Sequence, residues 1–299
     1  MNAMSWLETY RGTVYRWEVD QVDHFTVAFY FARFEDATDA ILHALGLDAP
    51  SLEGSGQACV TVGGYVRYRR ELRVGDILHM RSGVLAVEDD GLRLVHEVID
   101  SADGTLCTTF EHRVALVDRA SRARRSLTPK QREAALARRV DVAPVDEAQT
   151  APASPESEQG FIDSSRDAIK PAEANVLGEA GMAAYIHRFS AANSQVLSAF
   201  GFTPVYSRQE RRAYSTFEFR LSFPGTLRVG DLAHVRTALL HVGNSSIRIF
   251  HRMTNGRTGE LVATLEQAGV HLDLDARRPA PLPPALRERA LQLLVRPSA

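Results

Sequence analysis

The sequence LRVGD at residues 72–76 occurs a second time at residues 227–231, which sets a spacing of 155 residues from Leu72 to Leu227. At this spacing, aromatic residues fall on aromatic residues, histidines on histidines and acids on acids. The matched pairs include Tyr30 and Tyr185, Phe34 and Phe189, His79 and His234, His96 and His251, and Glu111 and Glu266. One register holds from about residue 20 to residue 140 without insertion, which predicts two tandem copies of one module.

The segment between the two copies has the composition of a linker. Residues 142–160, VAPVDEAQTAPASPESEQG, are rich in Ala, Pro, Ser and Glu and contain almost no large apolar side chain. We therefore predict a first module over residues 1–141, a linker over residues 142–165 and a second module over residues 166–299.

Composition restricts the class of protein. The 299 residues are 44% hydrophobic and 24% charged, with a formal charge of −2, so nothing favours nucleic acid or an anionic membrane as partner. No apolar run approaches the ~18 residues of a membrane span, and residues 1–12 lack the pattern of a signal peptide. Cys59 and Cys107 lie in separate strand-like stretches, so we expect both to be reduced. These observations predict a cytoplasmic protein.

Each module combines one long helix with a set of strands. Residues 25–45 contain neither Gly nor Pro before Gly46, and apolar residues cover most of the helical circumference, which predicts a helix wrapped by other structure. DDG at 89–91 and ADG at 102–104 are hairpin signals, and LRVGD is a polar turn between strands. The expected class is α+β. The predicted strands are 12–19, 57–70, 77–88, 92–100 and 105–117, with a short amphipathic helix after them.

The segment at the start of the helix carries a family resemblance. VDQVDHFTVAFYFARFEDATDA, residues 19–40, resembles the signature of 4-hydroxybenzoyl-CoA-type hotdog thioesterases, roughly D-x-x-G-H-x-N-x-x-x-Y-x-x-x-F-x-x-A. Asp23 stands where the family prefers Gly, and Thr26 stands where many members have Asn, so we expect the backbone turn at the site to differ. The matching residues are Asp20, His24, Tyr30, Phe34 and Ala37.

Within this family the segment is most similar to the betainyl-CoA thioesterases of carnitine breakdown, whose run is W-x-D-x-x-x-H…A-F-Y…F…A-T-D-A. The resemblance covers the first module and implies a hotdog fold, an antiparallel sheet wrapped around a central helix. Such modules usually pair sheet edge to sheet edge, so we expect the two modules to form a double hotdog within one chain. Such pairs often associate further into homo-oligomers. The corresponding residues here are Trp17 (shifted by one), Asp20, His24, Ala28 to Tyr30, Phe34 and Ala37 to Ala40.

The resemblance implies a catalytic role for Asp20. A thioester carbonyl at the N-terminus of a helix meets free backbone N–H groups and the positive end of the helix dipole. A carboxylate beside it can attack the carbonyl or activate a water molecule. The residues alone leave a second interpretation open, in which Asp20 is a helix N-cap or an exposed loop acid.

Further candidates lie on the same segment. His24 would orient Asp20 or the substrate, or would be a solvent-facing residue at the helix start. Glu35 is kept because some hotdog thioesterases use an acid on this helix; otherwise it is a polar residue on the wetter helix face. The aromatic residues Phe29, Tyr30 and Phe34 are expected to be core residues first and substrate-binding pocket wall second.

The second copy has lost the acid. The 155-residue spacing places Asn175 on Asp20, Glu179 on His24 and Ser190 on Glu35. Asn175, Gly178 and Gly181 resemble another hotdog thioesterase pattern, N-x-x-G-x-x-x-G, in which Asn helps to hold the water or the carbonyl. Hotdog sites are built from both halves of a pair, so two unequal sites are expected. Asn175 is either a working part of its site or a remnant.

The function predicted from this resemblance is hydrolysis of a small to medium acyl-CoA to free acid and CoA. CoA thiolate is a good leaving group, so we expect no metal and no cofactor besides the coenzyme A of the substrate. No P-loop, dinucleotide fingerprint, zinc-ligand spacing or G-x-S-x-G motif occurs. Two alternatives remain: a hotdog enoyl-CoA hydratase or dehydratase, and a non-catalytic acyl-CoA-binding protein.

Overall fold

The computed structural model describes residues 5–153, 155 and 157–295, and it divides the chain into two compact units between Thr150 and Ala151. This division falls inside the segment 142–165 that the sequence predicts to be a linker. The ends of the two predicted modules, residues 1–4 and 296–299, and residues 154 and 156 of that segment lie outside the described residues.

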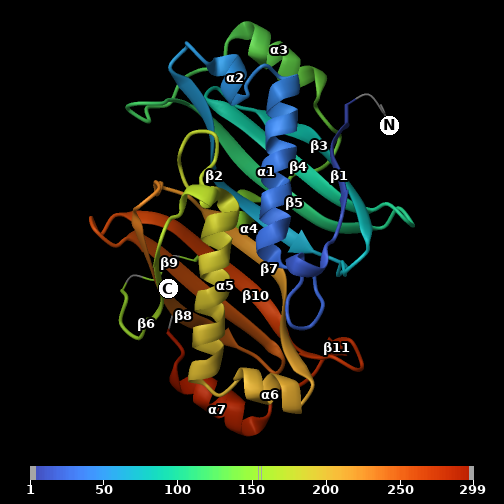
Figure 1. The fold of residues 1–299 in the computed structure, drawn as a ribbon, viewed down its shortest axis with the longest axis vertical. Coiled ribbons are helices and arrows are strands. Elements are labelled where there is room, and N and C mark those ends of the chain that lie inside the picture. The colour runs from blue at the N-terminus through green and yellow to red at the C-terminus, as the bar shows by residue number, and fades with distance from the viewer. Residues whose placement is uncertain (1–4, 154, 156, 296–299) are drawn as a thin grey trace. The chain divides into compact units, whose positions relative to one another are not determined.

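The first unit is an antiparallel sheet on which the long helix α1 lies (Figure 1). Its strand order is β1-β3-β4-β5-β2. The elements are β1 (Leu7–Thr13), the 3₁₀ turn η1 (Arg16–Glu18), α1 (Val27–Ala44), α2 (Ala49–Leu52), β2 (Gln57–Tyr68), β3 (Ile77–Val87), β4 (Gly91–Asp100), β5 (Leu106–Asp118), α3 (Pro129–Ala137) and α4 (Glu147–Thr150).

The second unit repeats this arrangement around the helix α5, with strand order β7-β10-β9-β8-β6 and the short strand β11 on β10. Its central helix and the strands β8, β9 and β10 begin 155 residues after their counterparts in the first unit. The elements are β6 (Ile162–Ala168), η2 (Pro171–Glu173), α5 (Met182–Ala199), α6 (Pro204–Gln209), β7 (Arg212–Ser222), β8 (Leu232–Val242), β9 (Ser246–Asn255), β10 (Leu261–Asp273), β11 (Arg278–Pro279) and α7 (Pro284–Gln292). The duplication and the α+β hotdog arrangement of each module are confirmed, and the repeat extends back to β1.

One predicted strand, residues 12–19, is wrong. The strand β1 ends at Thr13, where its pairing with β3 stops opposite Ile77. After it, Glu18 N donates to Tyr15 O at 3.0 Å, and the Glu18 carboxylate accepts from Tyr15 N at 2.9 Å. These local hydrogen bonds close a 3₁₀ turn in place of a ladder, although the alternating apolar pattern is that of a strand.

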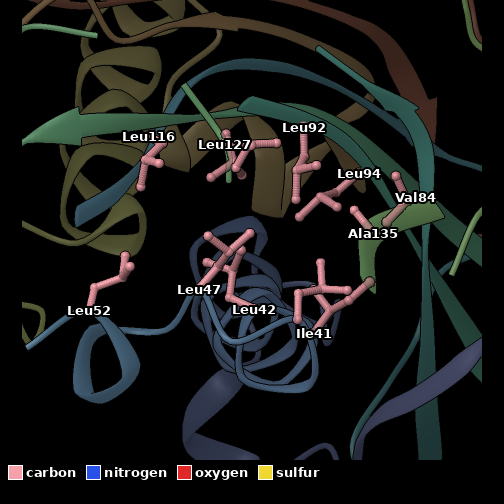
Figure 2. Close-up of a cluster of buried hydrophobic side chains, with 12 residues drawn as sticks. Ile41, Leu42, Leu47, Leu52, Val84, Leu92, Leu94, Leu116, Leu127 and Ala135 are labelled. Atoms are coloured by element: carbon pink, nitrogen blue, oxygen red, sulfur yellow. The ribbon is translucent and has the colours of Figure 1, made fainter. Parts of the chain in front are cut away.

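The central helix is enclosed as its sequence predicts. Phe31 and Phe34 have no exposed surface, and both pack against Phe110 of β5. Towards the C-terminal end of α1, apolar side chains from the helix, the sheet and α3 form one cluster (Figure 2). The residues labelled there are Ile41, Leu42, Leu47, Leu52, Val84, Leu92, Leu94, Leu116, Leu127 and Ala135.

The LRVGD turn has the same structure in both modules. Arg73 N donates to Asp76 Oδ2 at 2.8 Å, and Gly75 has a φ of +86°. In the second copy, Arg228 N donates to Asp231 Oδ2 at 2.8 Å, and Gly230 has a φ of +89°. The glycine supplies the left-handed conformation, and the aspartate holds the turn closed, which explains why the motif recurs.

A row of buried and partly buried polar side chains crosses the inner face of the first sheet. The two histidines at its centre are joined through Nε2 atoms 2.9 Å apart, and both have almost no exposed surface. Burial lowers the pKa of His96 to about 3 and lowers the pKa of His112 well below its usual value. Both are therefore neutral near pH 7. Thr38 of α1 contacts both imidazoles, and the row itself contains one residue from each strand in sheet order: Thr9, Ser82, His96, His112 and Thr61.

The helix α3 begins with a capping box that its counterpart α7 lacks. Thr128 Oγ1 accepts from Gln131 N at 3.3 Å, and Gln131 Oε1 accepts from Thr128 N at 2.9 Å, a complete capping box. The corresponding α7 has Pro283 at its N-cap position and no side-chain cap hydrogen bond. Thr128→Ala is expected to lower the free energy of unfolding by about 1 kcal/mol in urea titration. Exposed Lys130→Ala is the control, and equal stability of the two variants would contradict the prediction.

Candidate active site

The loop between η1 and α1 is closed by main-chain hydrogen bonds. Asp20 N donates to His24 O at 2.9 Å, and Thr26 N donates to Glu18 O at 2.9 Å. Phe25 N donates to Leu72 O at 2.8 Å, which attaches the loop to the LRVGD turn. The loop therefore enters α1 in one defined conformation.

Asp20 is an exposed loop acid with one fixed oxygen. Its Oδ1 accepts from Val22 N at 2.9 Å and from His24 N at 3.0 Å. Within the described part of the chain, Oδ2 makes no hydrogen bond or ion pair. The N-cap of α1 is Thr26, so the interpretation of Asp20 as a helix cap is wrong. One oxygen orders the loop, and the other is available to a bound molecule.

The backbone turn at Asp23 has the same conformation as the turn at Gly178 of the second module, contrary to the expectation from sequence. Asp23 has a φ of +62°, and Gly178 at the same place in the second module has a φ of +75°. The turns also share a hydrogen bond, from Asp23 N to Asp20 O at 3.1 Å and from Gly178 N to Asn175 O at 2.9 Å. Aspartate tolerates the left-handed region better than most residues, and Arg16 pairs with its carboxylate.

His24 contributes its main chain to Asp20, and its imidazole lies elsewhere. The amide of His24 donates to Asp20 Oδ1, as described above. Its Nε2 lies 3.1 Å from Glu71 Oε1, one residue before the LRVGD turn. The side chain of His24 therefore contacts an acid on a neighbouring segment, a partner that the sequence does not indicate.

Glu35 is not brought to Asp20 within the first module. It is half-buried on α1, eight residues after Val27, the first residue of the helix. At 1.5 Å of rise per residue, this places it about 12 Å along the helix axis from that end. Glu35 and Asp20 therefore lie at separate points of the first module.

The aromatic candidates on α1 differ in burial. Tyr30 and Phe34 are buried, and Phe29 is partly exposed. The Tyr30 ring lies 4.5 Å from the ring of Phe25 and 5.3 Å from that of Tyr68, measured between centroids. Burial raises the pKa of Tyr30. Tyr30 and Phe34 thus belong to the core of the module.

The second module repeats the loop with an amide in place of the carboxylate. Asn175 Oδ1 accepts from Leu177 N at 2.9 Å and from Glu179 N at 3.2 Å. Gly181 is the N-cap of α5, and its amide donates to Glu173 O at 2.9 Å. The fold therefore requires a side-chain oxygen at this position in both modules. The negative charge of Asp20 is not needed for this loop, because the neutral Asn175 makes the same hydrogen bonds.

An ion pair that was not predicted from the sequence supports each loop. Glu18 pairs with Arg33 in the first module, and Glu173 pairs with Arg188 in the second. Burial, the largest single effect, would raise the pKa of Glu173, but the hydrogen bonds and charge of Arg188 and of Lys170 together outweigh it, so the pKa is lowered. The 155-residue spacing places acid on acid and arginine on arginine, so this signal was present in the sequence.

Two negative findings concern the described residues. Among them, no group of three or more His, Cys, Asp and Glu side chains could hold a metal ion. None of the helices in the described ranges combines the length and the apolar character that a membrane crossing requires.

Comparison with known families identifies the module. The sequence matches the family model of the thioesterase-like superfamily over residues 14–156 and again over residues 169–290. The chain belongs to the thioesterase-like superfamily. Each of the two loops described above lies within one of the matched ranges, so the family model covers both copies of the candidate site in this thioesterase-like chain.

Named relatives match one part of this thioesterase-like chain. A stretch of 100 residues is 35% identical to the L-carnitine dehydrogenase/betainyl-CoA thioesterase of Agrobacterium fabrum, covering 33% of this chain and 20% of that protein. A stretch of 90 residues is 30% identical to the betainyl-CoA thioesterase of Pseudomonas aeruginosa, covering 30% of this chain and 57% of that protein. The chain thus spans about a fifth of the length of the first relative.

A solved structure matches nearly the whole chain. The 12:0-ACP thioesterase from Umbellularia californica has a TM-score of 0.70 to this chain at 13% identity. The match covers 92% of this chain and 95% of that one. At this level of identity the likeness shows a shared fold.

Proposed function

We propose that this protein is an acyl-CoA thioesterase that hydrolyses a small to medium acyl thioester to free acid and CoA. The observation that carries the proposal is the Asp20 carboxylate, with Oδ1 fixed by two amides and Oδ2 open at the entry to α1. Family membership and the names of the relatives support the same activity.

The proposed mechanism uses Asp20 as general base or nucleophile. The amides of Val27 and Ala28 precede the first intrahelical bond of α1, from Phe29 N to Thr26 O, and such amides suit a developing oxyanion. As general base, Asp20 takes a proton from water, the hydroxide oxygen bonds to the carbonyl carbon, and the C–S bond breaks to release CoA thiolate. As nucleophile, a carboxylate oxygen of Asp20 bonds to the carbonyl carbon, the C–S bond breaks to release CoA thiolate, and water then hydrolyses the mixed anhydride to the free acid and Asp20.

The two copies are proposed to be unequal. Asn175 has no acidic group, so it cannot serve as base or as carboxylate nucleophile at the corresponding point of the second module. Its Oδ1 already accepts two main-chain hydrogen bonds, and its amide nitrogen is left to hold a carbonyl or water. The chemistry is therefore assigned to the loop that contains Asp20.

The names of the relatives bear on the substrate, and the two cysteines bear on the location of the protein. Betainyl-CoA is named in the relatives, so small acyl groups of that kind are the first to test. Cys59 and Cys107 are both free thiols, and burial raises the pKa of Cys59 to about 12. Two unpaired cysteines support a location in the reducing cytoplasm.

The proposal is tested by measuring thiol release from a panel of acyl-CoA esters that includes betainyl-CoA, acetyl-CoA and medium-chain esters. We expect saturable CoA release with at least one member. Saturable binding in calorimetry without release would instead favour an acyl-CoA-binding protein. Loss of the enoyl chromophore with an enoyl-CoA, without thiol release, would favour a hydratase.

A further inference from the structure

An ion pair joins the turn before Asp20 to the central helix. Arg33 of α1 donates through Nη2 to Oε1 of Glu18, the last residue of η1. The Glu18 side chain is 3% exposed and that of Arg33 is 19% exposed. The second carboxylate oxygen accepts from Tyr15 N at 2.9 Å. Both oxygens of this buried acid are therefore engaged, as a buried charge requires.

The main chain of Glu18 also holds the far end of the loop. Its carbonyl oxygen accepts from Thr26 N at 2.9 Å and from Thr26 Oγ1 at 2.7 Å. Thr26 is the N-cap of α1, so Glu18 and Thr26 together close the loop that contains Asp20. Displacement of Glu18 would move both ends of that loop relative to the helix.

The position of Arg33 is set by the helix core. Its neighbours Phe31 and Phe34 are fully buried, and its guanidinium carbon lies 5.2 Å from the centre of the Tyr10 ring on β1. A rigid helix therefore fixes the arginine, and the arginine fixes Glu18. The carboxylate of Asp20 follows two residues later.

We propose that Glu18 and Arg33 are positioning residues that hold the Asp20 carboxylate at the N-terminus of α1; the proposal rests on the function proposed above. Neither residue is assigned a contact with substrate. Arg33 neutralises a buried acid and places the loop, and a displacement of about 1 Å at a reacting group can lower a rate by about a hundredfold.

The second module provides an internal comparison. Arg188 donates to both carboxylate oxygens of Glu173, at 3.0 and 2.9 Å, and to Asp167 at 2.6 Å. Here the arginine is the buried partner, at 2% exposure against 24% for Glu173. The pair is thus part of the fold in both modules, but only the first loop carries a carboxylate at the position of Asp20, where the second has Asn175.

The experiment compares Glu18→Gln with Glu173→Gln in the full chain. Each substitution removes the charge of one pair and keeps the size of the side chain. For Glu18→Gln we expect kcat to fall about tenfold to a hundredfold, with KM within about threefold of wild type. For Glu173→Gln we expect kcat within about twofold of wild type, although its urea midpoint should change about as much as that of Glu18→Gln.

Amide hydrogen exchange provides a readout independent of turnover. In Glu18→Gln we expect residues 20–25 to exchange about tenfold faster or more, with the second module unchanged. Retention of kcat in folded Glu18→Gln overturns the positioning role, whatever the exchange rate. An equal fall of kcat in both variants overturns it too, because global destabilisation then explains the loss.

Failure of the proposed function gives a different pattern. A wild-type chain that releases CoA from no ester, or an Asp20→Asn variant that retains full activity, contradicts the thioesterase assignment. In that case the exchange comparison still decides whether the Glu18–Arg33 pair holds the loop.

Discussion

Replacing Asp20 with Asn is expected to lower kcat/KM for thioester hydrolysis by about a hundredfold to ten-thousandfold. The amide keeps an oxygen for Val22 N and His24 N but cannot accept a proton or attack the carbonyl. The second module shows that Asn supports this loop, since Asn175 Oδ1 accepts the corresponding hydrogen bonds. The free energy of unfolding should therefore change by less than about 0.5 kcal/mol.

Two further variants separate the effect of the Asp20 charge from the effect of its hydrogen bonds to the loop. Asp23→Asn removes a carboxylate from the same loop at a residue that pairs with Arg16, and Asn tolerates the left-handed conformation there, so activity should be retained within about threefold. Asp20→Ala removes the acceptor of two amides and should also destabilise the protein by about 1–2 kcal/mol. Full activity of stable Asp20→Asn would remove Asp20 from the mechanism.

The strands and the helix were predictable because their side-chain periods are strong and are repeated. The predicted strands 57–70 and 77–88 agree closely with β2 (Gln57–Tyr68) and β3 (Ile77–Val87). The strand prediction for residues 12–19 was wrong because the backbone there is set by one side-chain contact. The Glu18 carboxylate accepts a hydrogen bond from Tyr15 N, and the periodicity of the sequence does not indicate such a contact. Local hydrogen bonding outweighed β-propensity there.

The candidate site was only partly predictable. The motif indicated Asp20 as a candidate, and Asn175 at the same position of the second module shows that this loop forms without the charge. The left-handed backbone of Asp23 was not foreseen, because the preference for Gly is a tendency that Asp can satisfy. The imidazole of His24 pairs with Glu71, 47 positions along the chain, and such a contact depends on how the LRVGD turn packs against the loop.

Acidification from pH 7 to pH 5 is expected to destabilise the first module strongly, because of its buried histidine pair. The pKa of His96 is lowered by burial to about 3, and that of His112 is lowered by burial and further by the neighbouring His96. In the unfolded chain, both titrate near 6.5. Below that pH the unfolded state binds protons that the native state does not, so stability is complete above 6.5 and is lost on acidification.

The expected loss at pH 5 is about 2 kcal/mol for each histidine, since each pH unit below 6.5 is worth about 1.4 kcal/mol per proton. Urea unfolding followed at several pH values between 5 and 8 measures the slope of the free energy against pH.

The second module supplies the variant that tests this account. There Gln267 and Asn193 stand at the positions of His112 and Thr38, and Gln267 Nε2 donates to Asn193 Oδ1 at 2.9 Å. The double substitution Thr38→Asn with His112→Gln should remove one titrating group from the first module and lower the slope between pH 6.5 and 5 by about 1.4 kcal/mol per pH unit. His43→Gln, at an exposed imidazole, is the control for loss of a histidine. An unchanged slope in the double variant would mean that His112, whose Nε2 lies 2.9 Å from that of His96, is not a source of the acid sensitivity.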